Sequence, residues 1–313
     1  MQTIWGIDLG GTKIEGVVLS SPSPDAVVIR HRIDTEAHLG YDHIISRITL
    51  LINYLRAETG YAPDRVGFST PGAFDPARRV MKNCNTTVLN GQPMPQDIAR
   101  TLGVPIEIAN DANCFALAEA MLGAVPDVLP DFRCVFGVIM GTGVGGGVVL
   151  KAPPMNGIEG RPFVLGGHHG IGGEWGHNIL EENGYPCYCG KRGCTEQVIS
   201  GPALERFYRE HSGESRRLKE IVQRHRDGID PVASETFDRL LERFGRGISV
   251  ILNFLDPDAV VLGGGVGNIP ELYTEGVERA RKYIFNERVI TTPFLKPKLG
   301  DSAGVFGAAM LVA

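Results

Sequence analysis

The sequence predicts an α/β protein with two lobes, and three observations support this fold class. The chain has 313 residues, a length that suits two lobes better than one. The segments that start at residues 3 and 134 share one pattern: an apolar strand, a glycine turn and a returning strand that ends in Gly-Val-Val-Leu. Apolar residues also recur at helical spacing over 42–58 and 237–255. Two similar halves that face a cleft would explain this faint internal duplication.

The elements of the first half are predicted from its apolar runs. The predicted strands lie at residues 3–9, 16–19, 27–33, 66–68 and 106–108. The first two strands flank a glycine turn, so they are expected to form a hairpin. The helix over 42–58 is amphipathic, and a polar, proline-rich stretch over 71–95 is predicted to be a loop.

The second half is preceded by a capped helix. Asn110 and Asp111 stand just before an apolar helix over 112–122, and both residue types are favoured at helix N-caps. Further strands are predicted at residues 134–140, 147–150 and 259–262. The long helix over 237–255 is expected to end before Pro257, because the residue ahead of a proline disfavours helical geometry.

The charge and hydropathy patterns exclude several classes of partner. The formal net charge of −5 argues against nucleic acid, which requires a basic surface. The first thirty residues lack the basic and apolar segments of a secretory signal, and no stretch reaches the ~18 apolar residues of a membrane span. We therefore expect a soluble, cytoplasmic protein with no membrane partner.

Three glycine-rich turns follow strands and predict a nucleotide site. They comprise Gly10, Gly11, Thr12 and Lys13, then Gly141, Thr142, Gly143 and Gly145, then Gly263, Gly264 and Gly265. Glycine lets backbone N–H groups approach phosphate oxygens with no Cβ in the way. The Walker A pattern and the Rossmann fingerprint are both absent. One such turn is explained equally well as a tight hairpin, but three together predict a bound nucleotide.

Three of the six cysteines crowd together and predict a metal site. Cys187, Cys189 and Cys194 combine with His177 to offer three thiolates and one imidazole, a full tetrahedral set for Zn²⁺. The alternative is three unrelated cysteines beside a surface histidine. Because no coordination position stays open, we expect a structural rather than a catalytic metal.

Four segments together resemble the ROK family of bacterial sugar kinases. They are residues 8–13, 110–113, 173–177 and 187–196, which follow the family's order along essentially the whole chain. The resemblance implies the actin-like ATPase fold of the hexokinase superfamily. It also implies that ATP and a sugar meet between a lobe of 1–117 with 301–313 and a lobe of 118–300. Some members are repressors with a preceding helix-turn-helix domain, but the first motif here starts at residue 8, so we expect a kinase.

The resemblance implies that Asp111 is the catalytic carboxylate. A kinase needs a carboxylate that orients the attacking hydroxyl and accepts its proton. The residues alone fit a helix N-cap at this position equally well. Asp8, at the end of the first strand, is expected to hold Mg²⁺ through water.

The resemblance also implies which residues contact the sugar. These are Glu174, His177 and Glu196, with Asn110 and Asp111 from the other side, and further contacts from Gly72 and Asn85. His177 would bind zinc through one ring nitrogen and face a sugar hydroxyl with the other. For the two glutamates, the alternative is solvated charge on a glycine-rich loop.

The identity of the sugar rests on finer resemblances. Residues 82–93 and 186–191 are most similar to fructokinases and mannokinases, whereas 110–119 and 141–147 are as similar to N-acetylglucosamine kinases. We expect transfer to the 6-hydroxyl of fructose, with N-acetylglucosamine, glucose and mannose as alternatives. One or two hydrogen bonds separate such sugars.

Two departures from the family pattern and two rival classes stay open. His168 and His169 replace other polar or small residues, and the stretch over 153–163 is longer than usual, which leaves the rim of the sugar pocket undefined.

A kinase of the same superfold with a non-hexose substrate conflicts with the zinc signature. A silent sugar-binding regulator conflicts with an intact Asp111. Family analogy also predicts a homodimer.

Overall fold

The computed structural model describes residues 3–155 and 160–313, which form two compact units. Unit 1 comprises Met1–Arg133, Gly147–Gly173 and Pro297–Ala313, and unit 2 comprises Cys134–Gly146 and Glu174–Lys296. Gly147–Gly173 packs with unit 1, so these units do not coincide with the predicted lobe bounds, which stay a prediction. The unusual stretch over 153–163 includes four positions outside the described residues.

Unit 1 is built on a five-stranded mixed sheet. Its strand order is β3 (Val27–Asp34), β2 (Lys13–Leu19), β1 (Ile4–Leu9), β4 (Val66–Thr70) and β7 (Ile106–Asn110). The first three strands are antiparallel, and β1, β4 and β7 are parallel. All five predicted strands and the hairpin are therefore confirmed. The carboxyl ends of the parallel strands carry the polar residues from which a site can be built.

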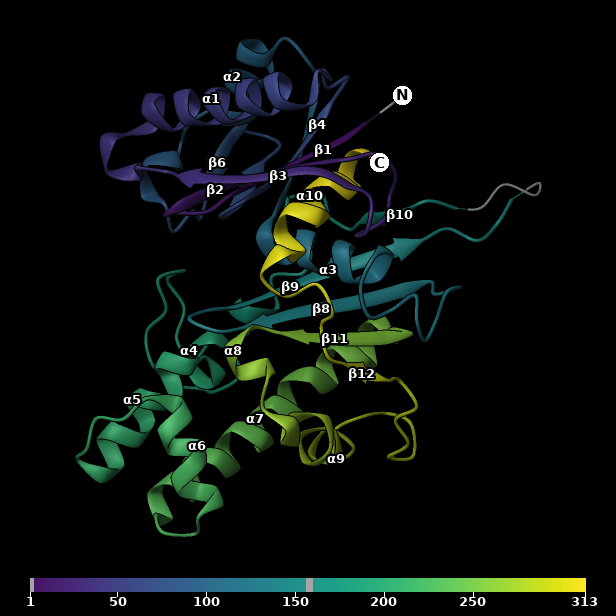
Figure 1. The fold of residues 1–313 in the computed structure, drawn as a ribbon. Helices are drawn as coiled ribbons and strands as arrows, with labels where there is room; N and C mark the ends of the chain where they lie inside the picture. Colours follow the sequence, from purple (N-terminus) through teal and green to yellow (C-terminus); the bar gives the residue numbers. More distant parts are fainter. Residues whose placement is uncertain (1–2, 156–159) are drawn as a thin grey trace. The chain divides into compact units, whose positions relative to one another are not determined.

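Helices cover both faces of this sheet. Figure 1 shows α1 (Tyr41–Thr59) and α2 (Met94–Leu102) on one face, with α3 (Asp111–Met121) and α10 (Ala303–Val312) on the other. The apolar stripe of α1 packs on the sheet through Ile44, Ile48, Leu51, Ile52 and Leu55. α10 is buried almost all round, because it lies between the sheet and α3.

The predicted loop over 71–95 is wrong in part. It contains a two-stranded hairpin, β5 (Ala73–Asp75) and β6 (Val80–Lys82), and a 3₁₀ turn at Thr87–Leu89. α2 also begins inside it, at Met94. Each hairpin strand has only three residues, too few to show an alternating pattern. The start of α2 is disguised by the prolines at 93 and 95, although proline is well tolerated in a first helical turn.

The second sheet runs in the order β10 (Pro162–Val164), β9 (Val144–Lys151), β8 (Cys134–Met140), β11 (Ala259–Gly263) and β12 (Phe294–Leu295). The strands predicted at 134–140, 147–150 and 259–262 are confirmed. β11 is parallel to β8 and to β12. The glycine turns follow β8 and β11 directly, so the strand order brings the second and third turns to one edge of unit 2.

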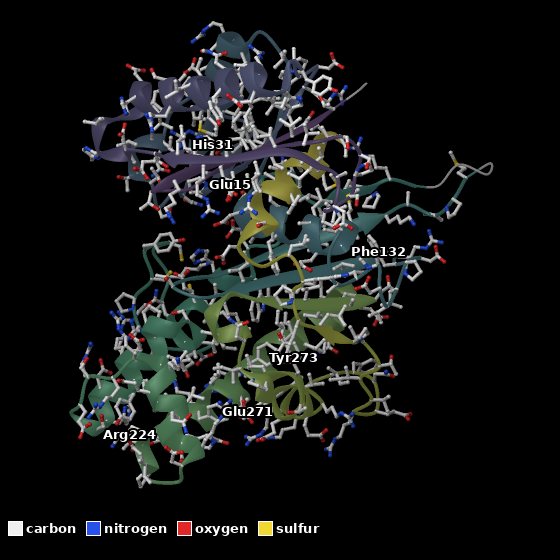
Figure 2. The ribbon with its side chains drawn as sticks, viewed as in Figure 1. Glu15, His31, Phe132, Arg224, Glu271 and Tyr273 are labelled. Atoms are coloured by element: carbon white, nitrogen blue, oxygen red, sulfur yellow. The ribbon has the colours of Figure 1, made fainter. Side chains whose placement is uncertain are left out.

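The helices of unit 2 surround the long helix α7. They are α4 (Glu196–Ile199), α5 (Gly201–Ser212), α6 (Leu218–Arg226), α7 (Pro231–Leu255), α8 (Gly264–Gly267) and α9 (Glu275–Ala280). α7 starts six residues before the predicted helix over 237–255, because Asp230 caps it and Pro231 suits its first position. Arg224, labelled in Figure 2, and Tyr208 both bond to Asp230. No described helix is long and apolar enough to cross a bilayer.

Candidate active site

Asp8 and Asp111 lie near one another at the carboxyl ends of β1 and β7. Asp8 is half-buried, and the desolvation of its carboxylate, reinforced by the charge of Asp111, raises its pKa to about 6, although the Ser69 hydroxyl opposes the rise. Gly304, near the start of α10, lies directly against the Asp8 carboxylate, where a Cβ would come within 2.7 Å of Oδ2. Asp8 is therefore a carboxyl group held in a confined space.

Asp111 is the first residue of α3 but does not cap it. Asn110 is the N-cap, and its side-chain oxygen accepts from the Asn113 N–H at 2.8 Å. The Asp111 carboxylate accepts from the Ala112 N–H at 2.8 Å. Protein surrounds this carboxylate, and the resulting desolvation raises its pKa, while the N–H of Ala112 lowers it. Asp111 as a whole is nevertheless exposed to solvent.

The first glycine turn joins β1 to β2 and is fixed by its neighbours. Gly10 N–H donates to the Lys13 carbonyl, and Thr35 N–H donates to the Thr12 carbonyl, each at 2.9 Å. The Thr35 hydroxyl adds a bond to the Gly10 carbonyl at 2.8 Å. Gly11, Thr12 and Lys13 are exposed to solvent.

Gly72 and Asn85 belong to the same unit and lie in the region around β5 and β6. Gly72 has a positive φ of 78°, and a Cβ there would lie 2.6 Å from the Lys82 carbonyl oxygen. The turn that carries Asn85 is held by Asn90, which accepts from Cys84 N–H at 2.8 Å and donates to Cys84 O at 3.0 Å. Asn85 itself is exposed.

In unit 2 the second and third glycine turns pack together. Gly264 has a positive φ of 80°, and a Cβ there would lie 2.3 Å from the Met140 carbonyl oxygen. Gly141 N–H closes its turn on the Gly143 carbonyl at 2.9 Å. After β11 the chain enters the single helical turn α8 instead of an extended loop. This turn is held by Tyr273 (Figure 2), whose hydroxyl lies 3.1 Å from Leu262 O and 2.8 Å from Gly267 O.

Glu196 connects the cysteine-rich segment to the second glycine turn. Its Oε2 accepts from the Val144 N–H at 3.1 Å, and a Cβ on Gly143 would come within 2.7 Å of that oxygen. Gly143 therefore has to be a glycine for this carboxylate to approach. Glu196 therefore has a structural role, because its carboxylate holds the second glycine turn in place.

The four predicted metal ligands converge. The ligand atoms of His177, Cys187, Cys189 and Cys194 all lie within 4.8 Å of one another. His177 Nδ1 is 3.5 Å from Cys187 Sγ, and Cys189 Sγ is 3.5 Å from Cys194 Sγ. A tetrahedron with Zn–S bonds of about 2.3 Å has edges of about 3.8 Å, so this donor set fits zinc.

Tyr188 occupies the other side of the His177 ring. Its hydroxyl is 2.9 Å from His177 Nε2, the nitrogen that was expected to face a sugar hydroxyl. Tyr188 is largely exposed, and the charges of Glu196 and Glu174 add to its desolvation in raising its pKa. Sequence reasoning missed this residue. Its position inside the cysteine motif is the only signal that pointed to it.

Comparison with known proteins decides the family. The model of the ROK family matches residues 4–313. The chain belongs to the ROK family of sugar kinases. Over 98% of both chains it is 33% identical to the N-acetyl-D-glucosamine kinase of Vibrio atlanticus (strain LGP32) and 32% identical to that of Vibrio cholerae.

Solved structures of ROK proteins share its fold. The ROK hexokinase of Thermus thermophilus is 30% identical, with a TM-score of 0.83 over 99% of this chain and 97% of that one. The ROK glucokinase of Streptomyces griseus, solved with glucose and AMPPNP, is 26% identical, with a TM-score of 0.73 over 99% and 98%. The expected actin-like ATPase fold is thereby confirmed.

Within this ROK chain the predicted site residues form two groups. Unit 1 carries Asp8, the first glycine turn, Gly72, Asn85, Asn110 and Asp111. Unit 2 carries the second and third glycine turns, Glu174, the four metal ligands and Glu196. Sequence reasoning missed Ser69 beside Asp8 and Tyr273 behind the third turn, because neither lies in a recognisable motif.

Proposed function

We propose that this chain transfers the γ-phosphoryl group of ATP to the 6-hydroxyl of a hexose. The observation that carries the proposal is Asp111, which stands at the first turn of α3 while Asn110 caps the helix. Because Asn110 is the N-cap and the Asp111 carboxylate bonds to the Ala112 N–H through Oδ1, its second oxygen could accept a hydrogen bond from an attacking hydroxyl. The alternative, that Asp111 is present only as the N-cap of α3, loses its main support because Asn110 is the N-cap.

Asp111 would orient the hydroxyl and take its proton as the bond to phosphorus forms. Because desolvation raises its pKa, it is a somewhat stronger base than a free aspartate. In a loose phosphoryl-transfer transition state the proton leaves late, so strong basicity is not required. Asp8 would hold Mg²⁺ through water, and that ion supplies charge neutralisation for the phosphates when it is bound.

The glycine turns would bind the nucleotide. Gly10 closes the first turn through its own N–H, so Gly11 and Thr12 would offer backbone N–H groups, Thr12 a hydroxyl and Lys13 an ammonium to phosphate oxygens. Turns at 141–145 and 263–265 offer close backbone approach from unit 2. The rigid hydrogen bonding of these turns supports the proposal, since a preorganised site loses little entropy on binding.

We propose that His177, Cys187, Cys189 and Cys194 hold a structural Zn²⁺. A zinc on Nδ1 would leave Nε2 protonated, so His177 would donate to the Tyr188 hydroxyl in the sugar-free protein. The metal would then fix the segment that leads into Glu196, the residue bonded to the second glycine turn. Glu174, Glu196 and His177 of unit 2, with Gly72, Asn85 and Asn110 of unit 1, are the proposed sugar contacts.

For the sugar itself we propose N-acetylglucosamine, with fructose as the second candidate. The names of the relatives at 32–33% identity support N-acetylglucosamine, and the resemblance of residues 82–93 and 186–191 to fructokinases supports fructose. The test is ATP-dependent ADP release with Mg²⁺ on a panel of N-acetylglucosamine, fructose, glucose and mannose. Highest kcat/KM on N-acetylglucosamine is expected. Release with none of these hexoses would contradict the kinase proposal, and fructose far above the rest would contradict the choice of sugar.

A further inference from the structure

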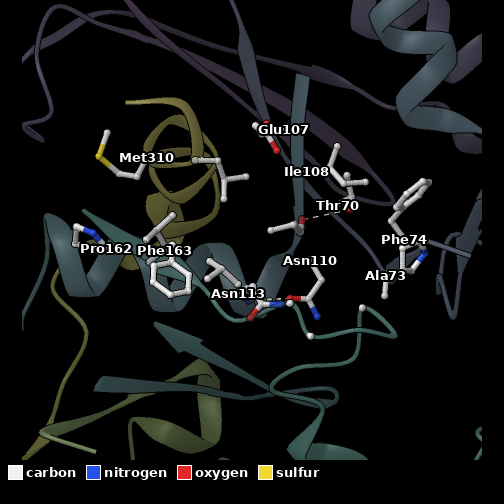
Figure 3. A pocket seen from close by; sticks show the side chains of 18 of the residues that line it. Thr70, Ala73, Phe74, Glu107, Ile108, Asn110, Asn113, Pro162, Phe163 and Met310 are labelled. Carbon is white, nitrogen blue, oxygen red and sulfur yellow. Dashed lines mark hydrogen bonds between the residues drawn. The ribbon is translucent and has the colours of Figure 1, made fainter. Parts of the chain in front are cut away.

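Unit 1 contains a cavity that extends beyond the proposed sugar contact Asn110. Its volume is about 620 Å³, within the range of sites for small molecules. Figure 3 shows it beside the first turn of α3 and the end of β7, with β10 and the last turn of α10 on its other side. All of its lining residues belong to unit 1.

Asn113 gives this cavity an unsatisfied polar group. Its side chain lines the cavity in the first turn of α3 and is only 7% exposed. Among the described residues, its Oδ1 has no hydrogen-bond partner. A buried acceptor without a donor is costly and rare in folded proteins. The oxygen is therefore suited to a ligand that brings an N–H or O–H group.

Most of the other lining residues are apolar or neutral, and the two charged ones are Glu107 and Arg161. Phe74, Leu117 and Phe163 are among the apolar residues that line the cavity, and Figure 3 shows Phe163 and Asn113 at its border. The guanidinium of Arg161 donates to the carbonyls of Met310 and Leu311 at 3.3 and 3.1 Å, so its charge is directed at the C-terminal end of α10. Because Glu107 and Arg161 have opposite charges and the remaining lining is uncharged, a neutral ligand with one donor and an apolar tail fits this cavity better than a charged one.

The cavity also adjoins the proposed sugar contacts. Asn110 lines it and immediately precedes Asp111. We propose that the cavity binds the N-acyl group of a 2-acylamino hexose, with the amide N–H on Asn113 Oδ1 and the acyl chain against Leu117 and Phe163. This inference rests on the proposed function. Because an acetyl group fills only a small part of the volume, N-acyl chains longer than acetyl are substrates too.

The first test is a chain-length series. Glucose and the N-acetyl, N-propanoyl and N-butanoyl derivatives of glucosamine are compared by kcat/KM for ADP release. We expect kcat/KM to hold or to rise by up to roughly fourfold with each added methylene, since burying a methylene is worth about 0.8 kcal/mol. A steep fall from acetyl to butanoyl would overturn the inference.

Two variants separate the hydrogen bond from the apolar contact. Asn113→Leu should lower the preference for N-acetylglucosamine over glucose by about tenfold. Phe163→Ala should abolish the gain with chain length. Phe254→Ala is the matched control, because Phe254 is an exposed phenylalanine on α7 of unit 2, with 86% exposure against 49% for Phe163. An unchanged sugar preference in Asn113→Leu, with a native thermal unfolding curve, would also overturn the inference.

Direct binding distinguishes failure of the inference from failure of the proposed function. Calorimetric titration with N-acetyl- and N-butanoylglucosamine measures affinity without turnover. Turnover of hexoses with no dependence of affinity on Asn113 would leave the kinase proposal standing and remove the subsite. Binding that depends on Asn113, with no ADP release for any hexose, would remove the kinase proposal and keep the subsite.

Discussion

At the scale of single residues, the pair Asp8 and Asp111 shows how the fold sets chemistry. Both carboxylates stand at the carboxyl ends of parallel strands of one sheet, and desolvation raises the pKa of each. Burial raises the pKa of Asp8 to about 6, and the like charge of Asp111 adds to this rise. Unit 1 therefore keeps a destabilising charge at the position where a cation would be bound.

This penalty predicts a pH-dependent stability. The pKa of Asp8 is 3.8 in the unfolded chain and about 6 in the folded chain. At pH values between these two, the folded chain therefore holds the Asp8 proton more tightly than the unfolded chain does. The free energy of unfolding therefore falls as pH rises through this window. Asp8→Asn should raise it by up to about 3 kcal/mol at pH 7.5 and by little at pH 4.

Thermal denaturation at the two pH values measures this difference. The gain at pH 7.5 should accompany loss of activity, as expected when a charged site residue opposes stability. Equal effects of Asp8→Asn at pH 4 and pH 7.5 would mean that Asp8 ionises normally in the folded chain.

At the scale of elements, Glu119 joins α3 to the chain that enters α10. It is fully buried, and its carboxylate accepts from the N–H groups of Ala124, Lys298 and Leu299 at 2.9–3.1 Å. Four bonds from these three donors hold the segment that follows residue 296 against α3. The placement of α10 on the sheet depends on this bonding.

Replacing Glu119 should therefore destabilise unit 1. Glu119→Gln substitutes an NH₂ donor for one acceptor oxygen and leaves buried N–H groups unpaired, at a cost of about 1–3 kcal/mol for each. Chemical denaturation measures the loss. Glu58→Gln, at an exposed position on α1, should change stability by no more than about 0.5 kcal/mol. Similar small effects of both substitutions would show that the Glu119 bonds contribute little.

The proposed zinc element makes a separate prediction. Cys189→Ser removes one of four ligands, so zinc content should fall well below one per chain and the thermal midpoint should drop. Cys134→Ser, a half-buried cysteine outside the cluster, should retain the metal. Elemental analysis and thermal denaturation check both. Absence of zinc from the purified unaltered chain would end this part of the proposal.

Sequence patterns predicted some elements well and others not at all. The β1–β2 hairpin was predictable because two apolar runs flank a glycine turn, and α1 because its apolar residues recur at helical spacing over 42–58. β5, β6 and α2 were missed because each is short and lies among prolines. The four metal ligands were predicted because cysteine spacing is distinctive. The contacts of Tyr188 and Asn113 depend on side-chain placement, which no local pattern encodes.

At the scale of the whole molecule, one chain forms two units that both carry proposed site residues. Unit 1 provides the carboxylates and the first glycine turn, and unit 2 provides the other turns and the cysteine cluster. The division cuts the second copy of the repeated pattern, because its first strand and glycine turn lie in unit 2 and its returning strand, from Gly147 on, lies in unit 1. The proposed function needs residues of both units. If one unit alone bound ATP, the turns of the other unit would have no part in nucleotide binding.

The most direct test of the account compares the unaltered chain with Asp111→Asn. Asparagine keeps an oxygen that can accept from Ala112 N–H, so α3 should stay intact and ATP affinity should change little. The rate of hexose-dependent ADP release in a single turnover should fall by about a hundredfold to ten-thousandfold, the usual contribution of a general base. A rate close to that of the unaltered chain, at saturating ATP and sugar, would contradict the central claim that this carboxylate activates the hydroxyl.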